Sequence, residues 1–276
     1  MWWRRLLLVP HIARLSRRAP ADVGARWDRY WADVSATGDG GDVLWDSSRP
    51  DEAGRYVELL TARADPARPV VDVGCGNGRF TRALAARFPR TVGLDLSAHA
   101  VERARAESVP GSPVPEFRVA DLTAPGAGRR LADELGPCTV FVRGVLHVLD
   151  PPARTRLAAN AADLVGAGGV VLVAETNYPG PLLGYLESLG GGPRGLPRPL
   201  ARAISAGIPR PSRFGDAELD ASFPPERWER LLVDGAARIS TVPLRDGAVA
   251  GGAGGDAGGT GARDSVPGYV ALLRHR

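Results

Sequence analysis

The chain has 276 residues, of which 44% are hydrophobic and 24% charged, and a formal net charge of +4 at pH 7. These values exclude a disordered or fibrous chain and suit one α/β domain with additions. All of the basic residues are arginine, and they are interspersed with the acidic ones without a block of five like charges. We therefore expect no nucleic-acid partner, and the arginine bias is typical of a GC-rich genome.

The cysteines and histidines give no pattern of a metal site. Cys75 and Cys138 are the only two cysteines, and the four histidines are scattered without the spacing of metal ligands. We expect no metal, no disulfide framework and a cytoplasmic location.

Residues 1–49 are predicted to form an N-terminal helical cap. The segment Met1–Arg18 mixes tryptophan and leucine with arginine, and its apolar part is too short to cross a bilayer, so no stable membrane insertion is expected. Trp27 and Trp31 are four residues apart and would share one helix face.

A helix over 50–64 is predicted to lead into a buried strand over 70–73, which is rich in valine. Gly74, Gly76 and Gly78 follow it, and then a helix over 79–87. This order predicts a cofactor cradle, because the glycines permit a tight turn and the helix presents free N–H groups. A dinucleotide fingerprint would need its third glycine one residue later, where Arg79 stands, so a nicotinamide cofactor is disfavoured.

The sequence Asp-Val-Gly-Cys-Gly-Asn-Gly, residues 72–78, resembles motif I of the class I S-adenosylmethionine-dependent methyltransferases. The resemblance implies that S-adenosylmethionine is the cofactor and that this loop takes its methionine half, with Asp72, Gly74, Gly76 and Asn77 in the site. The tryptophans of the cap, with Trp45-Asp46, loosely resemble the N-terminal cap of thiopurine-methyltransferase-like enzymes. That likeness makes Trp45 a candidate substrate contact.

The second strand, over 91–95, ends in Asp95, about twenty residues beyond the glycine loop, where a doubly wound fold binds ribose hydroxyls. Asp95 could instead cap the next helix, but Ser97 already fits that role for a helix over 98–107. We assign Asp95 and the neighbouring Leu96 to the cofactor. A third strand over 116–121 ends in Asp121, and the resemblance assigns Asp121 and Leu122 to adenine; capping of the 126–135 region is the alternative for Asp121.

The fourth strand, over 138–143, directs Arg143 and His147 toward the edge of the sheet where ligands bind. Arg143 is counted with the cofactor-binding residues, and its guanidinium could also bind a substrate carboxylate or phosphate. Arginine departs from the aromatic, Asn or Asp that the family often carries there. His147 is the candidate catalytic base or acceptor-orienting group, and packing beneath the loop is its alternative.

A helix over 152–165 and a fifth strand over 168–175 complete the parallel part of the predicted sheet, with Glu175 and Asn177 as substrate contacts on topology alone. The connection 178–225 is too long for a plain loop and is predicted to be a substrate lid with helices over 182–189 and 199–206. After it we predict a helix over 224–233, strands over 237–244 and 269–273, and a flexible Gly-rich loop over 247–262.

The sequence thus predicts an α/β fold: a Rossmann-like, doubly wound, seven-stranded and mainly parallel sheet over 50–276, with an N-terminal cap and a lid inserted after strand five. The resemblance implies a methyltransferase acting on a small molecule, in bacterial specialised metabolism by our interpretation, and a homodimer is compatible with it. The alternative is a protein of the same fold that uses bound S-adenosylmethionine for a cyclisation or rearrangement, or as a structural ligand.

Overall fold

The computed structural model describes residues 8–17, 19–38, 40–46, 50–109, 113–192, 195–241 and 265–276. Their strands form one sheet in the order β3-β2-β1-β4-β5-β8-β6, with β7 paired to β8. The parallel strands are β1 (Val70–Val73), β2 (Thr91–Asp95), β3 (Glu116–Val119), β4 (Thr139–Arg143) and β5 (Val170–Thr176). The antiparallel strands are β6 (Trp228–Asp234), β7 (Arg238–Ser240) and β8 (Ser265–His275). The α/β, mainly parallel sheet that the sequence predicts is confirmed.

The strand order reverses between β1 and β4, which are neighbours although β2 and β3 lie between them in the chain. Val73 of β1 is in register with Leu94 of β2 on one side and with Val142 of β4 on the other. The loops after these strands therefore emerge together at one edge of the sheet, and such a switch point is where open α/β sheets bind ligands. All residues of β1, β2, β4 and β5 are buried, as their apolar runs predict.

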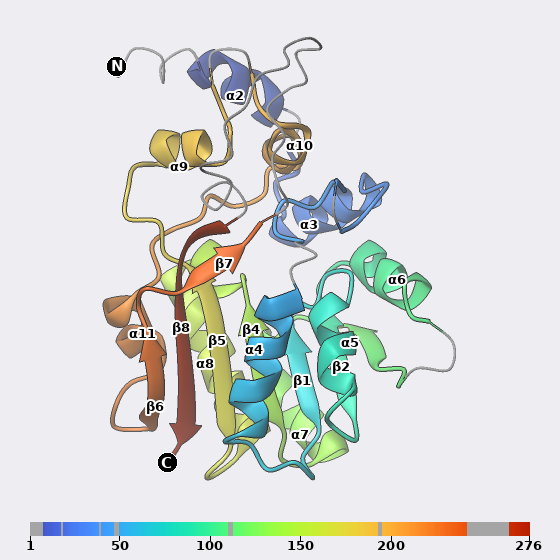
Figure 1. Ribbon diagram of the computed structural model, residues 1–276, viewed down its shortest axis with the longest axis vertical. Coiled ribbons are helices and arrows are strands. Elements are labelled where there is room, and N and C mark those ends of the chain that lie inside the picture. The colour runs from blue at the N-terminus through green and yellow to red at the C-terminus, as the bar shows by residue number, and fades with distance from the viewer. Residues whose placement is uncertain are drawn as a thin grey trace, which may run out of the picture.

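Helices cover both faces of the sheet (Figure 1). Apolar residues of α4 (Pro50–Thr61) and α5 (Arg79–Ala85) share one core cluster with the strands, while those of α7 (Ala127–Leu135), α8 (Pro151–Val165) and α11 (Asp216–Ser222) share the other. The helix α6 (Ala98–Ala106) packs beside β2 and β3 at the end of the sheet. The Ser97 hydroxyl accepts a hydrogen bond from Ala100 N–H, which confirms the predicted N-cap of α6.

Four helices form a roof over the carboxyl edge of the sheet (Figure 1). They are α2 (Leu8–Ser16), α3 (Val23–Ala32), α9 (Leu182–Ser188) and α10 (Arg198–Ala206). The helix α10 packs against both α2 and α3, and Arg202 of α10 is 3.1 Å from the Asp42 carboxylate. Helices of the predicted cap and the predicted lid thus lie in one layer, although residues 50–177 separate these two segments in the chain.

The helix predicted over 224–233 is wrong, because Trp228–Asp234 is strand β6. Pro224 and Pro225 resemble a helix start, and the spacing of the apolar residues after them fits a helix, with 3.6 residues per turn, as well as a strand, with a period of 2. This segment forms a strand because it pairs with the long strand β8, with a bulge between Arg230 and Leu232. The described sheet therefore has eight strands, one more than predicted, and the predicted Gly-rich loop over 247–262 lies outside the described residues.

Candidate active site

A cavity of about 520 Å³ lies between the roof helices and the carboxyl edge of the sheet. The glycine loop, the ends of β1, β2 and β4, and residues of α2, α3, α9 and α10 contribute to its wall. Every residue that the sequence assigns to the cofactor lines it: Asp72, Gly74, Gly76, Asn77, Asp95, Leu96, Asp121, Leu122 and Arg143. His147 and Trp45 line it as well, whereas Glu175 and Asn177 lie outside its wall.

The glycine loop needs glycine for two reasons. Gly74, Gly76 and Gly78 have φ angles of 73°, 54° and 76°, in the left-handed region that other residues rarely adopt. A Cβ on Gly74 would lie 2.4 Å from Val145 Cγ2, and a Cβ on Gly76 would lie 2.8 Å from the Trp31 ring. The loop is therefore closely covered by α3, a contact that the sequence does not predict.

Two buried carboxyl groups stand at the base of the cavity. Asp95 Oδ2 accepts a hydrogen bond from Gly76 N–H at 3.0 Å, and its Oδ1 accepts one from Ser97 N–H at 2.9 Å. A carboxylate has about four acceptor positions, so Asp95 keeps acceptor capacity for a further donor. Asp72 accepts a bond from the Thr81 hydroxyl at 2.6 Å. Among the described residues neither carboxylate forms an ion pair.

Burial sets the protonation of these two groups. It raises the pKa of Asp72 to about 7 and the pKa of Asp95 to about 6, because the charged form loses its hydration. A cationic ligand bound beside them would supply the missing counter-charge. An ammonium or sulfonium group therefore suits this end of the cavity, and vicinal hydroxyls suit the free lone pairs of Asp95.

Asp121, Leu122 and Leu96 form the neighbouring stretch of wall. Leu122 is buried and Leu96 is 38% exposed, and both contribute apolar surface to the wall. Asp121 is exposed, and one of its oxygens accepts bonds from the N–H and the hydroxyl of Thr123, each at 2.7 Å. Its second oxygen has no recorded partner in the described part of the chain, which leaves an acceptor at the rim.

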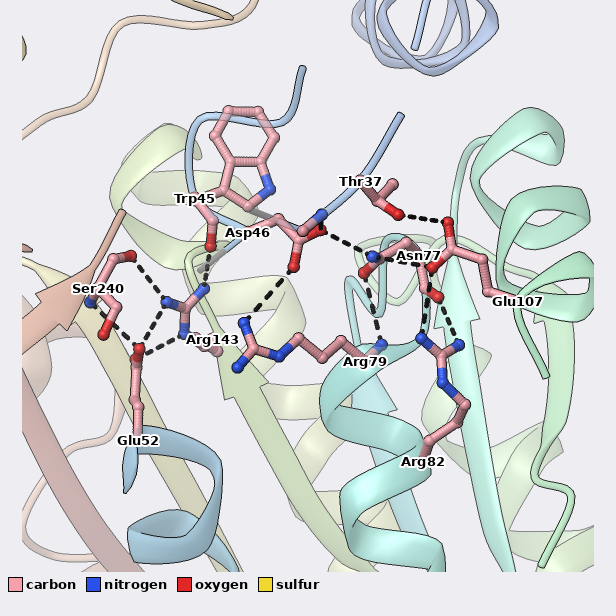
Figure 2. A network of polar contacts seen from close by, with 11 residues as sticks. Thr37, Trp45, Asp46, Glu52, Asn77, Arg79, Arg82, Glu107, Arg143 and Ser240 are labelled. Carbon is pink, nitrogen blue, oxygen red and sulfur yellow. Dashed lines mark hydrogen bonds and ion pairs between the residues drawn. The ribbon is translucent and has the colours of Figure 1, made fainter. Parts of the chain in front are cut away.

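The N-terminal segment is fastened to the glycine loop by Asp46 (Figure 2). Asp46 Oδ2 accepts hydrogen bonds from Asn77 Nδ2 at 2.9 Å and from Gly38 N–H at 2.7 Å. The Asn77 amide also donates to Glu107 at 3.2 Å. Asn77 thus connects the glycine loop with the cap and with the end of α6, and its side chain lines the cavity.

Arg143 is held by an internal partner (Figure 2). Its Nε and one terminal nitrogen bind the two oxygens of Glu52 at 2.9 and 3.2 Å, and it also donates to the carbonyls of Trp45 and Ser240. Burial alone would raise the pKa of Glu52, but the Arg143 guanidinium overrides it and holds that pKa below its ordinary value. The guanidinium fork is therefore occupied by partners within the protein.

His147 is paired with Glu175 beneath the wall. The distance from His147 Nδ1 to Glu175 Oε2 is 2.6 Å, and the same carboxylate accepts bonds from the N–H groups of Val145, Leu146 and His147. Since a carboxylate only accepts, Nδ1 carries the proton in this pair. The other ring nitrogen, Nε2, forms no hydrogen bond that is recorded among the described residues, and His147 lines the cavity.

Glu175 and Asn177 occupy supporting positions. Glu175 is fully buried behind His147, so this geometry gives it a partner in the protein and no direct contact with a substrate. The Asn177 N–H donates to the Pro267 carbonyl at 2.8 Å, and its side-chain oxygen is buried without a recorded partner in the described part. Both were predicted from topology alone, which places them at the correct strand end without giving the side-chain direction.

Within the described residues, no cluster of three or more His, Cys, Asp or Glu side chains is arranged to hold a metal ion. No helix of that part is long and apolar enough to cross a membrane.

A family model described as "Methyltransferase domain" matches residues 70–169, which include the glycine loop, Asp95, Asp121, Arg143 and His147. Over this part the chain is similar to methyltransferases. The matched part runs from β1 to the residue before β5, and so contains the whole switch point.

Several curated proteins and a solved structure are similar to this chain. A trans-aconitate 2-methyltransferase of Methylobacterium radiotolerans is 29% identical over 68% of this chain and 66% of its own length. One of Acidovorax sp. is 44% identical over 42% of each chain, so both matches leave a third or more of the relatives uncovered. A crystal structure described as a SAM-dependent methyltransferase from Anabaena variabilis covers 94% of this chain and 98% of its own, with 23% identity and a TM-score of 0.75. That likeness supports the fold of the chain, including the roof.

Proposed function

We propose that this chain is a methyltransferase that binds S-adenosylmethionine and transfers its methyl group to a small-molecule acceptor held under the roof helices. The observation that carries the proposal is that the glycine loop, Asp72, Asp95, Asp121 and His147 line one and the same cavity. Asp72 would lie near the cationic methionine end, Asp95 would accept the ribose hydroxyls, and Asp121 with Leu122 would hold the adenine.

When bound, S-adenosylmethionine supplies a methyl group that its sulfonium already activates. The task left for the chain is to align the acceptor and exclude water, and correct alignment is worth roughly 7–11 kcal/mol of barrier. The roof formed by the cap and lid helices would exclude water. Glu175 fixes the proton of His147 on Nδ1, which leaves Nε2 able to take a proton from an acceptor hydroxyl or amine.

The proposal is tested by incubating the protein with methyl-deuterated S-adenosylmethionine and a set of phenols, amines and carboxylic acids, with mass spectrometry of the products. Transfer of the labelled methyl to one of them supports it. Consumption of the cofactor in which the label never reaches an acceptor would contradict it.

We further propose a role in bacterial specialised metabolism and a cytoplasmic location. The exclusive use of arginine is typical of a GC-rich genome, and the two buried, free cysteines suit a reducing compartment. A homodimer, and the absence of a nucleic-acid partner, stay predictions that light scattering and a nucleic-acid shift assay test.

A further inference from the structure

The part of the cavity wall that the roof contributes is apolar and aromatic. The residues concerned come from α2, α3, α9, α10 and the segment before α4: Ile12, Trp27, Trp45, Leu182, Tyr185 and Ile204. Trp27 and Trp45 pack edge to face with their ring centroids 5.7 Å apart, and Trp45 stacks on Tyr30 at 5.1 Å. These residues come from other elements than the carboxyl groups at the base of the same cavity, so we take their side of the wall as the part left for the acceptor.

The wall offers little positive charge. Three arginines line the cavity, against four aspartates. Arg143 is bound to Glu52, and Arg26 donates to the carbonyls of Pro20, Ala21 and Gly207. Arg210 is exposed, lines the cavity and has no partner recorded among the described residues. One cation is thus free to meet an anionic group, near the solvent.

A polyanionic acceptor does not suit this wall. Each carboxylate taken out of water loses its hydration, and this loss is offset only by a paired cation or by several donors. A flat apolar acceptor instead gains from removing its own surface from water and from contact with the tryptophan rings.

On the basis of the proposed function, we infer that the acceptor has a largely apolar, flat body, one hydroxyl or amine that reaches His147, and at most one anionic group, which Arg210 binds. Trans-aconitate, the substrate in the names of the curated relatives, carries three carboxylates and is not the acceptor. The acceptor specificity of this chain therefore differs from that of those relatives even though they share the cofactor-binding half.

The test uses 8-anilinonaphthalene-1-sulfonate, which has a flat apolar body and one anionic group, and whose fluorescence rises in apolar sites. The full chain is first saturated with S-adenosylhomocysteine. We expect saturable binding of the probe at one site, and no displacement by excess trans-aconitate.

Two variants on one helix locate the site. Ile204 lies in the cavity wall, and Ile204→Glu should weaken binding of the probe by about tenfold or more. Ser205 is the next residue and does not line the cavity, so Ser205→Glu should leave the affinity for the probe within about twofold. Both should keep the affinity for S-adenosylhomocysteine, which shows that they fold. If Ile204→Glu is unstable, Leu182→Glu on α9 replaces it.

Displacement of the probe by trans-aconitate would overturn the inference. An equal loss of probe affinity in Ile204→Glu and in Ser205→Glu would overturn it as well. So would failure of the probe to bind a protein that binds S-adenosylhomocysteine. Failure to bind S-adenosylhomocysteine at all is a different result, which would contradict the proposed function itself.

Discussion

His147 Nδ1 lies 2.6 Å from Glu175 Oε2, and Glu175 is fully buried with three backbone N–H groups on the same carboxylate. The imidazole is thus fixed in position and in tautomer before any ligand binds. A base prepared in this way is useful only if the acceptor must lose a proton, so the pair gives a direct test of the proposed chemistry.

Replacing His147 with Ala should lower kcat at least about tenfold with a methylated acceptor, because the proton acceptor is lost. The affinity for S-adenosylhomocysteine, measured by calorimetry, should stay the same. Glu175→Gln should also lower kcat, since the amide can donate to Nδ1 and leave the proton on Nε2. An unchanged kcat in His147→Ala would show that His147 only packs under its loop.

Asp95→Ala should weaken binding of S-adenosylhomocysteine by at least about tenfold, because the ribose would lose its acceptor and Gly76 N–H would be left without a partner. Ser97→Ala is the matched control. It removes the N-cap of α6 and should cost about 1 kcal/mol of stability while leaving the affinity unchanged. Equal affinities in Asp95→Ala and the unmodified protein would show that the ribose assignment is wrong.

The affinity for S-adenosylmethionine should depend on pH through Asp72, because burial raises the pKa of this carboxyl group to about 7. A cationic ligand favours the ionised carboxylate and lowers this pKa, so binding releases a proton near neutral pH. The affinity should therefore rise from pH 5.5 and become level above about 7. Asp72→Asn, which cannot ionise, should lose the part of this dependence that belongs to Asp72, while Asp95, with its pKa raised to about 6, keeps its own part. Proton release is measured by calorimetry in buffers of different ionisation enthalpy, and none at pH 6.5 would contradict the prediction.

The ion pair of Arg143 and Glu52 should matter for stability. Glu52→Gln leaves a buried guanidinium without its counter-charge and should cost about 3–5 kcal/mol in urea unfolding. Because the folded protein holds the pKa of Glu52 below its ordinary value, the contribution is present above the pKa of the unfolded chain and is lost as pH falls through the folded one. The double variant Glu52→Leu/Arg143→Met should recover part of the loss. A cost below about 1 kcal/mol in Glu52→Gln would show that the pair contributes little.

The sequence predicts the parallel half of the fold well, because its signals are local. Valine-rich runs end in Asp95 and Arg143, and glycines occupy the positions with left-handed φ. The helix predicted over 224–233 is wrong, because the spacing of its apolar residues fits both a helix and a strand. Pairing with β8, which is distant in the chain, makes this segment a strand.

In the site, too, local signals predict some features, and others depend on residues that are distant in the chain. Strand ends bring Asp72, Asp95 and His147 to one cavity, as their positions after strands predict. The pairing of Arg143 with Glu52, 91 residues away, and the cover of Gly76 by Trp31 depend on how the cap packs on the sheet. No local pattern carries that information. The only signal for Trp31 is its spacing of four from Trp27, which predicts a shared helix face and says nothing of the partner.

Parallel calorimetric titrations with S-adenosylmethionine, S-adenosylhomocysteine and NADH test the central claim most directly. The account predicts that the two adenosyl-sulfur ligands bind at one site per chain and that NADH does not bind. Tight binding of NADH, or binding of none of the three, would contradict the assignment of the glycine loop, Asp72 and Asp95 to S-adenosylmethionine.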